Sequence, residues 1–167
     1  MIFQTKRLQI KPITPEDRED VLDLVTDSTV GKTYMFPEYQ TREAAEPLFQ
    51  RLVELSKDDS RYVAGVYLDG RFIGMMNAVE IKETQVEMGY AFLPPYYNRG
   101  YATESFQGAI AYLFDHGFTT VLAGAFSENA ASMRVMEKCG MTRQDFTEDI
   151  DYRGVTHTCI YYAVTKK

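Results

Sequence analysis

The sequence predicts one α/β domain of the α+β type, in which helices cover both faces of a single mixed, mostly antiparallel twisted sheet. Three observations lead to this fold class. The chain has 167 residues, the usual length of one domain. Hydrophobic residues make up 45%, which is enough for a sizeable core. Strand-like and helix-like apolar patterns succeed one another without a repeat or linker, so we expect one domain over residues 1–167.

The first third of the chain begins with a strand and continues with two helices. Polar and apolar residues alternate over residues 7–13, and Pro12 places this strand at an edge or at a strand end. Residues 14–17 (Thr-Pro-Glu-Asp) are typical of a helix start, because the threonine can cap and the acids favour the positive end of the helix. After an irregular stretch over 29–40, apolar residues at helical spacing predict a second helix from about residue 41.

The middle of the chain predicts a three-stranded meander. Residues 61–81 predict a hairpin with 69–70 (Asp-Gly) as its two-residue turn. Residues 84–93 add a third strand, which ends at 94–95 (Pro-Pro) because proline cannot continue a hydrogen-bonded ladder. A loop then leads into a helix over about 102–116.

The last part predicts three more strands and a short helix. Residues 119–126 form a buried strand, which should run parallel to the third meander strand because a helix separates the two. Asn129 caps a short helix that Gly140 ends, and strand-like runs follow over 142–151 and 156–165.

Composition and motifs exclude several classes of protein. The net charge is −6 and there is no basic run, so the chain is a poor candidate for nucleic-acid binding and a better one for an amine substrate. Its apolar runs are far shorter than the roughly 20 residues of a membrane span, and its N-terminus lacks the order of a signal peptide. Neither a Gly-x-Ser-x-Gly elbow nor a Gly-Lys-Ser/Thr phosphate loop occurs, which argues against serine hydrolases and P-loop enzymes.

Cysteine and histidine are scarce. Cys139 and Cys159 form neither a disulfide framework nor a CxxC pair, so a reducing cytoplasmic location is the simplest expectation. His116 and His157 are too few for most zinc sites, and we expect no metal.

The segment 97–104 joins a strand to a helix and could bind a diphosphate. A helix start presents unpaired backbone N–H groups at its positive end, and Gly100 and Ala102 let a ligand approach the backbone closely. The alternative is an ordinary helix start with a glycine turn, since short glycine patterns are common.

Residues 100–104 (Gly-Tyr-Ala-Thr-Glu) resemble motif A of the GNAT superfamily, the acyl-CoA-dependent N-acyltransferases. The string is similar to that of the Rim-type branch, the ribosomal-protein N-terminal acetyltransferases and their relatives. That branch often has an aromatic residue where other members have Gln or Arg, here Tyr97. Residues 129–141 resemble the branch's Asn-x-x-Ser…Lys-x-Gly-Phe segment, and residues 5–17 resemble its opening. The resemblance implies the GNAT fold and acetyl-CoA (coenzyme A) as co-substrate, with the diphosphate held by backbone amides.

The resemblance also implies where coenzyme A is held. The strand at 84–93 should splay from its parallel neighbour, so that free N–H groups near its end hold the pantetheine arm and polarise the thioester. The residues expected to bind the coenzyme are Ala91, Phe92, Leu93, Asn98, Arg99, Gly100, Tyr101, Ala102, Thr103, Asn129 and Ser132.

Amine acetylation requires a neutral amine, and carboxylates are the candidate bases. A free amine has a pKa of roughly 8 to 10 and is mostly protonated at neutral pH. Glu87 is the first candidate, because the superfamily often carries a catalytic Glu in this region; the alternative is a Glu on a solvated strand face. Asp151 is the second, although Asp149 or Glu148 could serve instead, and all three could be exposed acids of a turn.

The candidate proton donor to the leaving thiolate is Ser132. Many relatives carry a Tyr seven residues beyond the Asn, but that position is Met136, which cannot donate a proton. The Rim-type alternative is the serine, which could donate to the thiolate or bond the pantetheine. The competing interpretation is that Ser132 only helps to cap the helix opened by Asn129.

The sequence therefore predicts transfer of an acetyl group to a primary amine by direct attack. The Rim-like segments favour a protein N-terminus, and small amines, including antibiotics, are the first alternative. A non-catalytic acyl-CoA-binding module is the second. The irregular stretch Gly31 to Tyr39 could face the acceptor. A shared edge strand in the tail would allow a homodimer.

Overall fold

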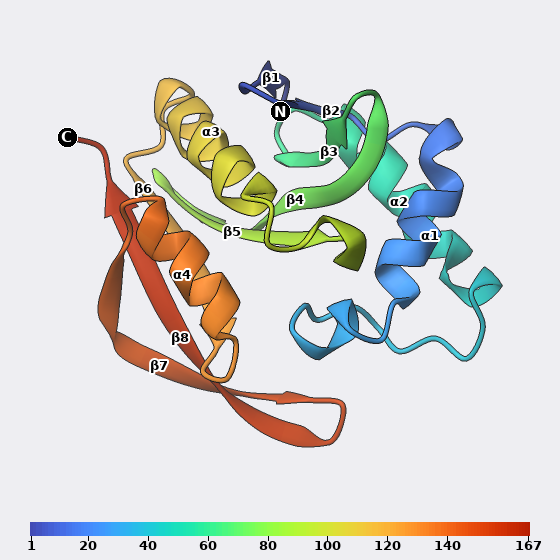
Figure 1. Ribbon diagram of the computed structural model, residues 1–167. Helices are drawn as coiled ribbons and strands as arrows, with labels where there is room; N and C mark the ends of the chain where they lie inside the picture. The colour runs from blue at the N-terminus through green and yellow to red at the C-terminus, as the bar shows by residue number, and fades with distance from the viewer.

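One eight-stranded sheet runs through the computed structural model, which describes all of residues 1–167 (Figure 1). The strands are β1 (Phe3–Gln4), β2 (Leu8–Lys11), β3 (Val63–Leu68), β4 (Arg71–Lys82), β5 (Gln85–Phe92), β6 (Thr120–Phe126), β7 (Thr142–Tyr152) and β8 (Val155–Thr165). Their order across the sheet is β1-β2-β3-β4-β5-β6-β8-β7. Every neighbouring pair is antiparallel except β5 and β6, which are parallel. The predicted mixed, mostly antiparallel sheet is confirmed.

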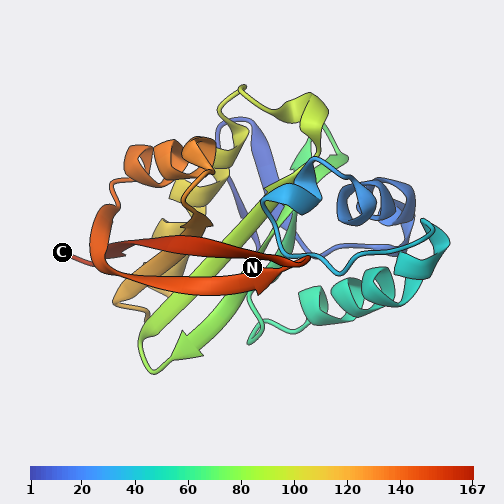
Figure 2. The same ribbon diagram turned by 90° about the horizontal axis from the view of Figure 1, so that it is seen from below.

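Four α-helices cover the two faces of this sheet. They are α1 (Arg18–Thr26), α2 (Glu46–Lys57), α3 (Tyr101–Asp115) and α4 (Ala130–Lys138). Short 3₁₀ turns are η1 (Pro15–Asp17), η2 (Val30–Lys32), η3 (Glu43–Ala45) and η4 (Pro94–Tyr96). The pair α3–α4 and the pair α1–α2 lie on opposite sides of the sheet (Figures 1 and 2). No helix combines the length and apolar character needed to cross a bilayer.

Strand β5 is buried on both faces, because it lies in the middle of the sheet. Met88 and Phe92 point into the core under α3 and α4, whereas Ala91 and Leu93 point into the core under α1 and α2. This follows from the period of two in a strand. Alternate residues of β5 therefore reach opposite sides of the molecule.

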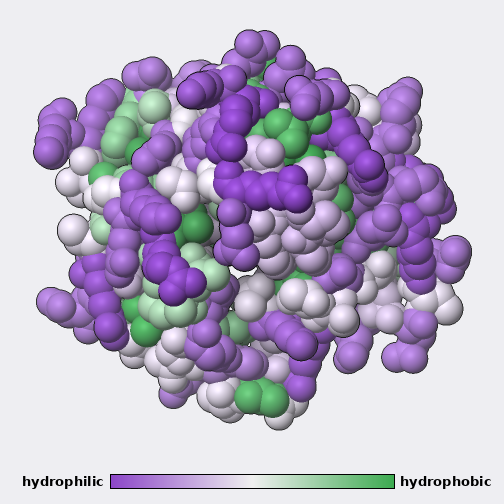
Figure 3. Space-filling model, in the orientation of Figure 1, coloured by the Kyte–Doolittle hydropathy of each residue, from purple (hydrophilic) through white to green (hydrophobic).

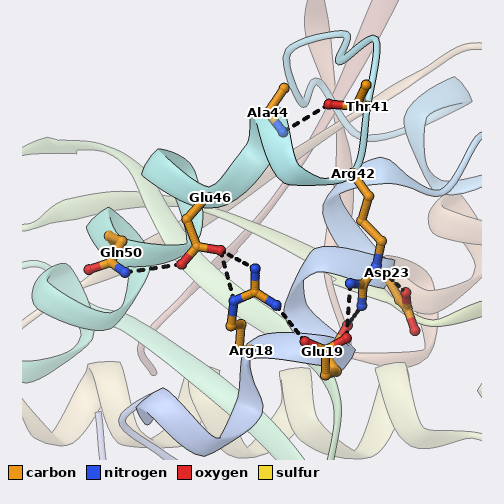
Figure 4. A network of polar contacts seen from close by, with 8 residues as sticks. All are labelled: Arg18, Glu19, Asp23, Thr41, Arg42, Ala44, Glu46 and Gln50. Carbon is orange, nitrogen blue, oxygen red and sulfur yellow. Dashed lines mark hydrogen bonds and ion pairs between the residues drawn. The ribbon is translucent and has the colours of Figure 1, made fainter.

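Charged side chains tie α1 to the start of α2 (Figure 4). Arg18 contacts Glu46 (Nη2–Oε2 2.6 Å) and Glu19, and Arg42 pairs with Asp23 (Nε–Oδ1 2.9 Å) and with Glu19. Exposed pairs of this kind contribute little individually, of the order of 0–1 kcal/mol. The network orients α2 relative to α1 on the outer side of the sheet.

The elements differ from expectation in two places. The two-residue strand β1 was not predicted, because it is too short to show a period. The helix expected from residue 41 begins only at Glu46, after a 3₁₀ turn. The order of the tail strands was not predicted: β8 lies beside β6, and β7 forms the outer edge. The predicted 69–70 turn is confirmed, with positive φ at Asp69 and Gly70.

Candidate active site

Strands β5 and β6 part halfway along their length. They pair only from Gln85 opposite Thr120 to Glu87 opposite Leu122. Beyond this point β5 stays paired with β4, and β6 stays paired with β8. The predicted splay between the two parallel strands is confirmed, and it leaves a gap beside the second half of β5.

Alternate N–H groups of β5 point into this gap. The Leu93 N–H donates to the Ile73 carbonyl on β4 at 2.9 Å. Because N–H directions alternate along an antiparallel ladder, the Ala91 N–H also points to β4, and those of Tyr90 and Phe92 point to the gap. The expectation of free N–H groups at Ala91 and Leu93 is therefore wrong, since both groups point into the ladder with β4.

The start of α3 presents a row of unpaired backbone N–H groups. Glu104 makes the first intrahelical bond, to the Gly100 carbonyl at 3.0 Å. The N–H groups of residues 98–103 have no acceptor in the chain. Asn98 and Gly100 have φ of +59° and +79°, and this left-handed backbone turns the loop into the helix. An anion is the ligand that such a row favours.

Glu104 holds the N-terminal segment against this loop. Its carboxylate accepts hydrogen bonds from the Thr5 hydroxyl (2.6 Å) and from Arg7 Nε (2.7 Å). Burial would raise the pKa of Glu104, but the bonds from Thr5 and Arg7 outweigh it and lower the pKa. Arg7 also donates to the Arg99 carbonyl and lies over the Tyr101 ring at 4.6 Å. The two segments that resemble motif A and the family's opening are thus in direct contact.

The first turn of α4 lies beside β5. Asn129 Oδ1 accepts from the Ser132 N–H at 3.1 Å, so the predicted cap is confirmed. Ser132 Oγ lies 2.8 Å from the Tyr90 hydroxyl of β5. Met136 is completely buried in the core. Tyr90 was missed in the sequence, although its place three residues after Glu87 puts it on the opposite face of the strand, toward α4.

Figure 3 shows the same side of the molecule as Figure 1, and its surface is mostly hydrophilic with scattered apolar patches. A small hollow is visible near the middle of this view. Figure 1 places the first turns of α3 and α4 and the segment after α1 around that position.

Glu87 lies on the other face of β5, in a pocket of about 150 Å³. Burial is the main cause that raises its pKa, and the neighbouring carboxylates of Glu80 and Glu148 raise it further. Lys82 opposes this shift. A carboxylate with a raised pKa is a stronger base than an exposed one, which suits proton removal from an ammonium group. No group of three or more His, Cys, Asp or Glu residues is arranged to hold a metal ion.

The β7–β8 hairpin supplies one carboxylate to this pocket. The Tyr161 hydroxyl donates to Glu148 Oε2 at 2.7 Å, and both residues line the pocket with Glu87. Asp151, in contrast, is exposed near the turn of the hairpin, where it accepts from Thr156 Oγ1 at 2.6 Å. Strand alternation places Asp151 on the face of β7 opposite to Glu148. The structure brings together Glu87 and Glu148, and it does not bring Asp151 to them.

The irregular stretch after α1 also reaches this face of β5. The Tyr34 hydroxyl bonds Asn77 on β4, and its ring lies over Gly89, where an added Cβ would come within 3.3 Å. Burial raises the pKa of Tyr34 to about 12, so its hydroxyl stays protonated. The Tyr152 hydroxyl at the hairpin tip donates to the Gly31 carbonyl at 2.7 Å. The β7–β8 hairpin therefore holds the segment after α1 in place on the face of β5 that carries Glu87.

Comparison with known proteins identifies the family. The family described as "Acetyltransferase (GNAT) domain" matches residues 7–142. The chain belongs to the GNAT acetyltransferases. The GNAT fold expected from motif A is thereby shown, and the splayed strands and the free N–H row lie within the matched residues.

Several GNAT relatives are similar over nearly the whole chain. YnaD of Bacillus subtilis, an uncharacterized N-acetyltransferase, is 33% identical over 87% of this chain and 85% of its own. The crystal structure of a GNAT-family acetyltransferase from Bacillus anthracis has a TM-score of 0.85 at 27% identity, covering 99% and 98%. RimL, a ribosomal L7/L12 alpha-N-protein acetyltransferase in complex with coenzyme A, has a TM-score of 0.82 at 16% identity, covering 98% and 97%. At that identity the likeness to RimL shows the fold alone.

Proposed function

We propose that this GNAT chain transfers an acetyl group from acetyl-CoA to a primary amine by direct attack within a ternary complex. One observation carries the proposal: the row of free N–H groups at 98–103 and the gap beside β5 both lie at the C-terminal end of that strand. If the N–H groups of residues 98–103 hold the diphosphate of coenzyme A, its extended pantetheine arm can lie in the gap beside β5. These residues fit coenzyme A without a basic patch, because backbone amides at a helix start neutralise an anion.

Within this proposal, the residues expected from the sequence divide into two groups. Asn98 to Thr103 hold the diphosphate through backbone N–H groups. Phe92, and Tyr90 in place of Leu93, offer N–H groups to the pantetheine and the thioester carbonyl, while Ala91 and Leu93 contribute only packing. Bound acetyl-CoA would supply the acetyl group as a thioester.

Two side chains, one at each face of β5, then act on the amine and on the departing sulfur. Glu87 removes the amine proton, directly or through water, because burial and neighbouring carboxylates raise its pKa and make it a stronger base than an exposed carboxylate. Ser132 hydrogen-bonds the departing sulfur, and Asn129 positions it by capping α4. Glu148, rather than Asp151, is the tail carboxylate that shares a pocket with Glu87, and its charge helps to raise the Glu87 pKa.

The acceptor is proposed to be a primary amine, either a peptide N-terminus or a small amine. The Rim-like segments and the fold of RimL support the first. The pocket that Glu87 and Glu148 line supports a small cationic amine: Lys82 pairs with Glu80 at 2.8 Å, which leaves two carboxylates in excess to favour positive charge there. A cytoplasmic location, and a homodimer through the free edge of β7, remain proposals that rest on the two free cysteines and on the sheet order.

The test is release of free thiol from acetyl-CoA in the presence of an amine panel that includes peptides with free N-termini, diamines, amino sugars and amino acids. Calorimetric titration with coenzyme A runs in parallel. Amine-dependent thiol release is the expected result. Tight coenzyme binding without turnover on any amine would instead support the non-catalytic acyl-CoA-binding module, and no coenzyme binding would exclude both.

A further inference from the structure

The hydrogen bond between Tyr90 and Ser132 joins β5 to the first turn of α4. Tyr90 Oη lies 2.8 Å from Ser132 Oγ and 3.4 Å from the Ser132 carbonyl. The Tyr90 ring packs against Phe106 of α3 with centroids 5.0 Å apart, so the phenol is held at its ring and at its hydroxyl. Its hydroxyl has no other partner in the chain.

The distances from the Tyr90 hydroxyl to its two acceptors indicate the direction of its bond with Ser132. Both acceptors within reach of the Tyr90 hydroxyl belong to Ser132, and the carbonyl is at the limit of bonding distance. Either hydroxyl can donate across the 2.8 Å contact. Donation by Tyr90 to Ser132 Oγ gives the phenol a hydrogen bond of ordinary length, whereas the Ser132 carbonyl lies 3.4 Å away, and a buried phenol without a good acceptor loses free energy. The Ser132 N–H is already used by Asn129, and Ser132 Oγ makes no bond to a helix carbonyl. With Tyr90 as the donor, the Ser132 hydroxyl hydrogen is free to point away from α4.

We propose that Tyr90 is a positioning residue for the departure of coenzyme A: by donating to Ser132 Oγ, it directs the serine hydrogen at the sulfur. This inference rests on the proposed acetyl transfer. The amine lone pair forms the N–C bond, the C–S bond breaks, and its electron pair leaves on sulfur. Ser132 stabilises that charge with a hydrogen bond, the amine proton passes to Glu87 or water, and the thiolate regains a proton from water.

Tyr90 itself keeps its proton throughout. Burial raises the pKa of the phenol, so a buried phenolate is disfavoured. Its contribution is to orient and polarise the serine, since hydrogen bonds in a chain strengthen one another. Ser132 alone, with a freely rotating hydroxyl, would spend part of its time bonded elsewhere.

The helix cannot provide this phenol, because Met136 occupies the position where many relatives have a Tyr. Met136 follows Ser132 by four residues, about one helical turn and roughly 6 Å along α4. Its thioether is buried and carries no proton to donate. Instead, Tyr90 of β5 places its phenol beside Ser132, one helical turn before Met136.

The decisive variant is Tyr90→Phe, which retains the ring against Phe106 and removes only the hydroxyl. We expect kcat to fall about tenfold with little change in KM, the loss expected for one hydrogen bond made chiefly in the transition state. A second readout needs no turnover. Above the pKa of the thiol, the preference of the protein for coenzyme A over desulfo-coenzyme A should fall about tenfold in Tyr90→Phe, because the thiolate loses its oriented donor.

Tyr162→Phe is the matched control. Tyr162 belongs to the same core, and its hydroxyl also bonds α4, at Glu137 Oε1 (3.1 Å), but away from Ser132. It should leave kcat and the coenzyme preference unchanged while costing similar stability. Tyr90→Phe in a Ser132→Ala background should have no further effect, because Tyr90 acts through the serine.

Three results would overturn the inference: full additivity of the two substitutions, an unchanged coenzyme preference in Tyr90→Phe, or an equal loss in Tyr162→Phe. Should Tyr90→Phe fail to fold, Ser132→Ala alone must show the same fall in coenzyme preference, and an unchanged value there refutes the inference. A wild-type protein that binds coenzyme A but acetylates no amine would refute the proposed function and, with it, a role in coenzyme departure. The comparison with desulfo-coenzyme A would still show whether Tyr90 directs the Ser132 hydroxyl at the sulfur.

Discussion

Replacing Gly100 by alanine tests the anion-binding row at the start of α3. Gly100 has φ of +79°, a left-handed conformation that costs a residue with a Cβ about 1–2 kcal/mol. The new Cβ would lie 3.3 Å from Arg7 Nη2, the end of a flexible side chain that can move slightly. We therefore expect the free energy of unfolding to fall by about 1–2 kcal/mol. For a chain of this size that lowers the melting temperature by roughly 2–8 °C.

Gly140→Ala provides a control with the same backbone strain. Gly140 also has φ of +79°, and nothing lies within 4 Å of its added Cβ, but it follows the end of α4 and contributes no N–H to the row. Both variants should lose similar stability in thermal unfolding. Only Gly100→Ala should bind coenzyme A more weakly, because relaxation of its strained backbone turns one or two N–H groups away from the diphosphate.

The expected loss of affinity follows from the strength of such bonds. A hydrogen bond to a charged group contributes about 1.5–3 kcal/mol, so one lost bond weakens binding by roughly 10- to 100-fold. Calorimetric titration with coenzyme A at fixed ionic strength measures it. Equal weakening in Gly100→Ala and Gly140→Ala, or unchanged affinity in Gly100→Ala, would show that this row does not bind the diphosphate.

Three further predictions concern the acceptor side of the site. Glu87→Gln should lower kcat/KM by about 10²-fold or more and abolish the rise in activity that occurs as pH increases through the raised pKa of Glu87; a pH profile identical to wild type would exclude it as the base. Glu148→Gln removes a like charge that raises the Glu87 pKa, so the acid limb of the profile should move to lower pH, whereas Asp151→Asn should leave it in place; the reverse pattern would assign the role to Asp151. Tyr152→Phe removes the hydroxyl that holds the Gly31 carbonyl and should raise the KM for the amine several-fold without changing coenzyme affinity, and an unchanged KM would separate this loop from acceptor binding.

Local patterns were sufficient for most of the elements. The 69–70 turn, the Asn129 cap and the Gly140 helix end depend on neighbouring residues, and each is confirmed. The parallel relation of β5 and β6 also follows from the chain, because a helix between two strands of one sheet makes a crossover. Boundaries were predicted less well where 3₁₀ turns precede a helix, as before Glu46, since these turns share the helix's sequence preferences.

Side-chain partners across the sheet could not be predicted in this way. Glu104 belongs to motif A by its position, but its partners Thr5 and Arg7 lie almost a hundred residues away. The contact of Tyr90 with Ser132 joins a strand to a helix on one face, and the pocket that Glu87 and Glu148 both line lies on the other. Strand order and register decide all three, and both are properties of the whole sheet.

The sequence by itself determined the family and the fold class, and it predicted the backbone elements that are proposed to hold an anion, because glycine positions, caps and strand periods act over a few residues. Only the tertiary structure decided which side chains serve those elements. The Leu93 N–H donates to β4 and is not free, whereas Tyr90 lies beside the gap and its hydroxyl contacts Ser132. Glu148, rather than Asp151, lies near Glu87. The two residues are three positions apart on β7, and side chains an odd number of positions apart point to opposite faces of the sheet.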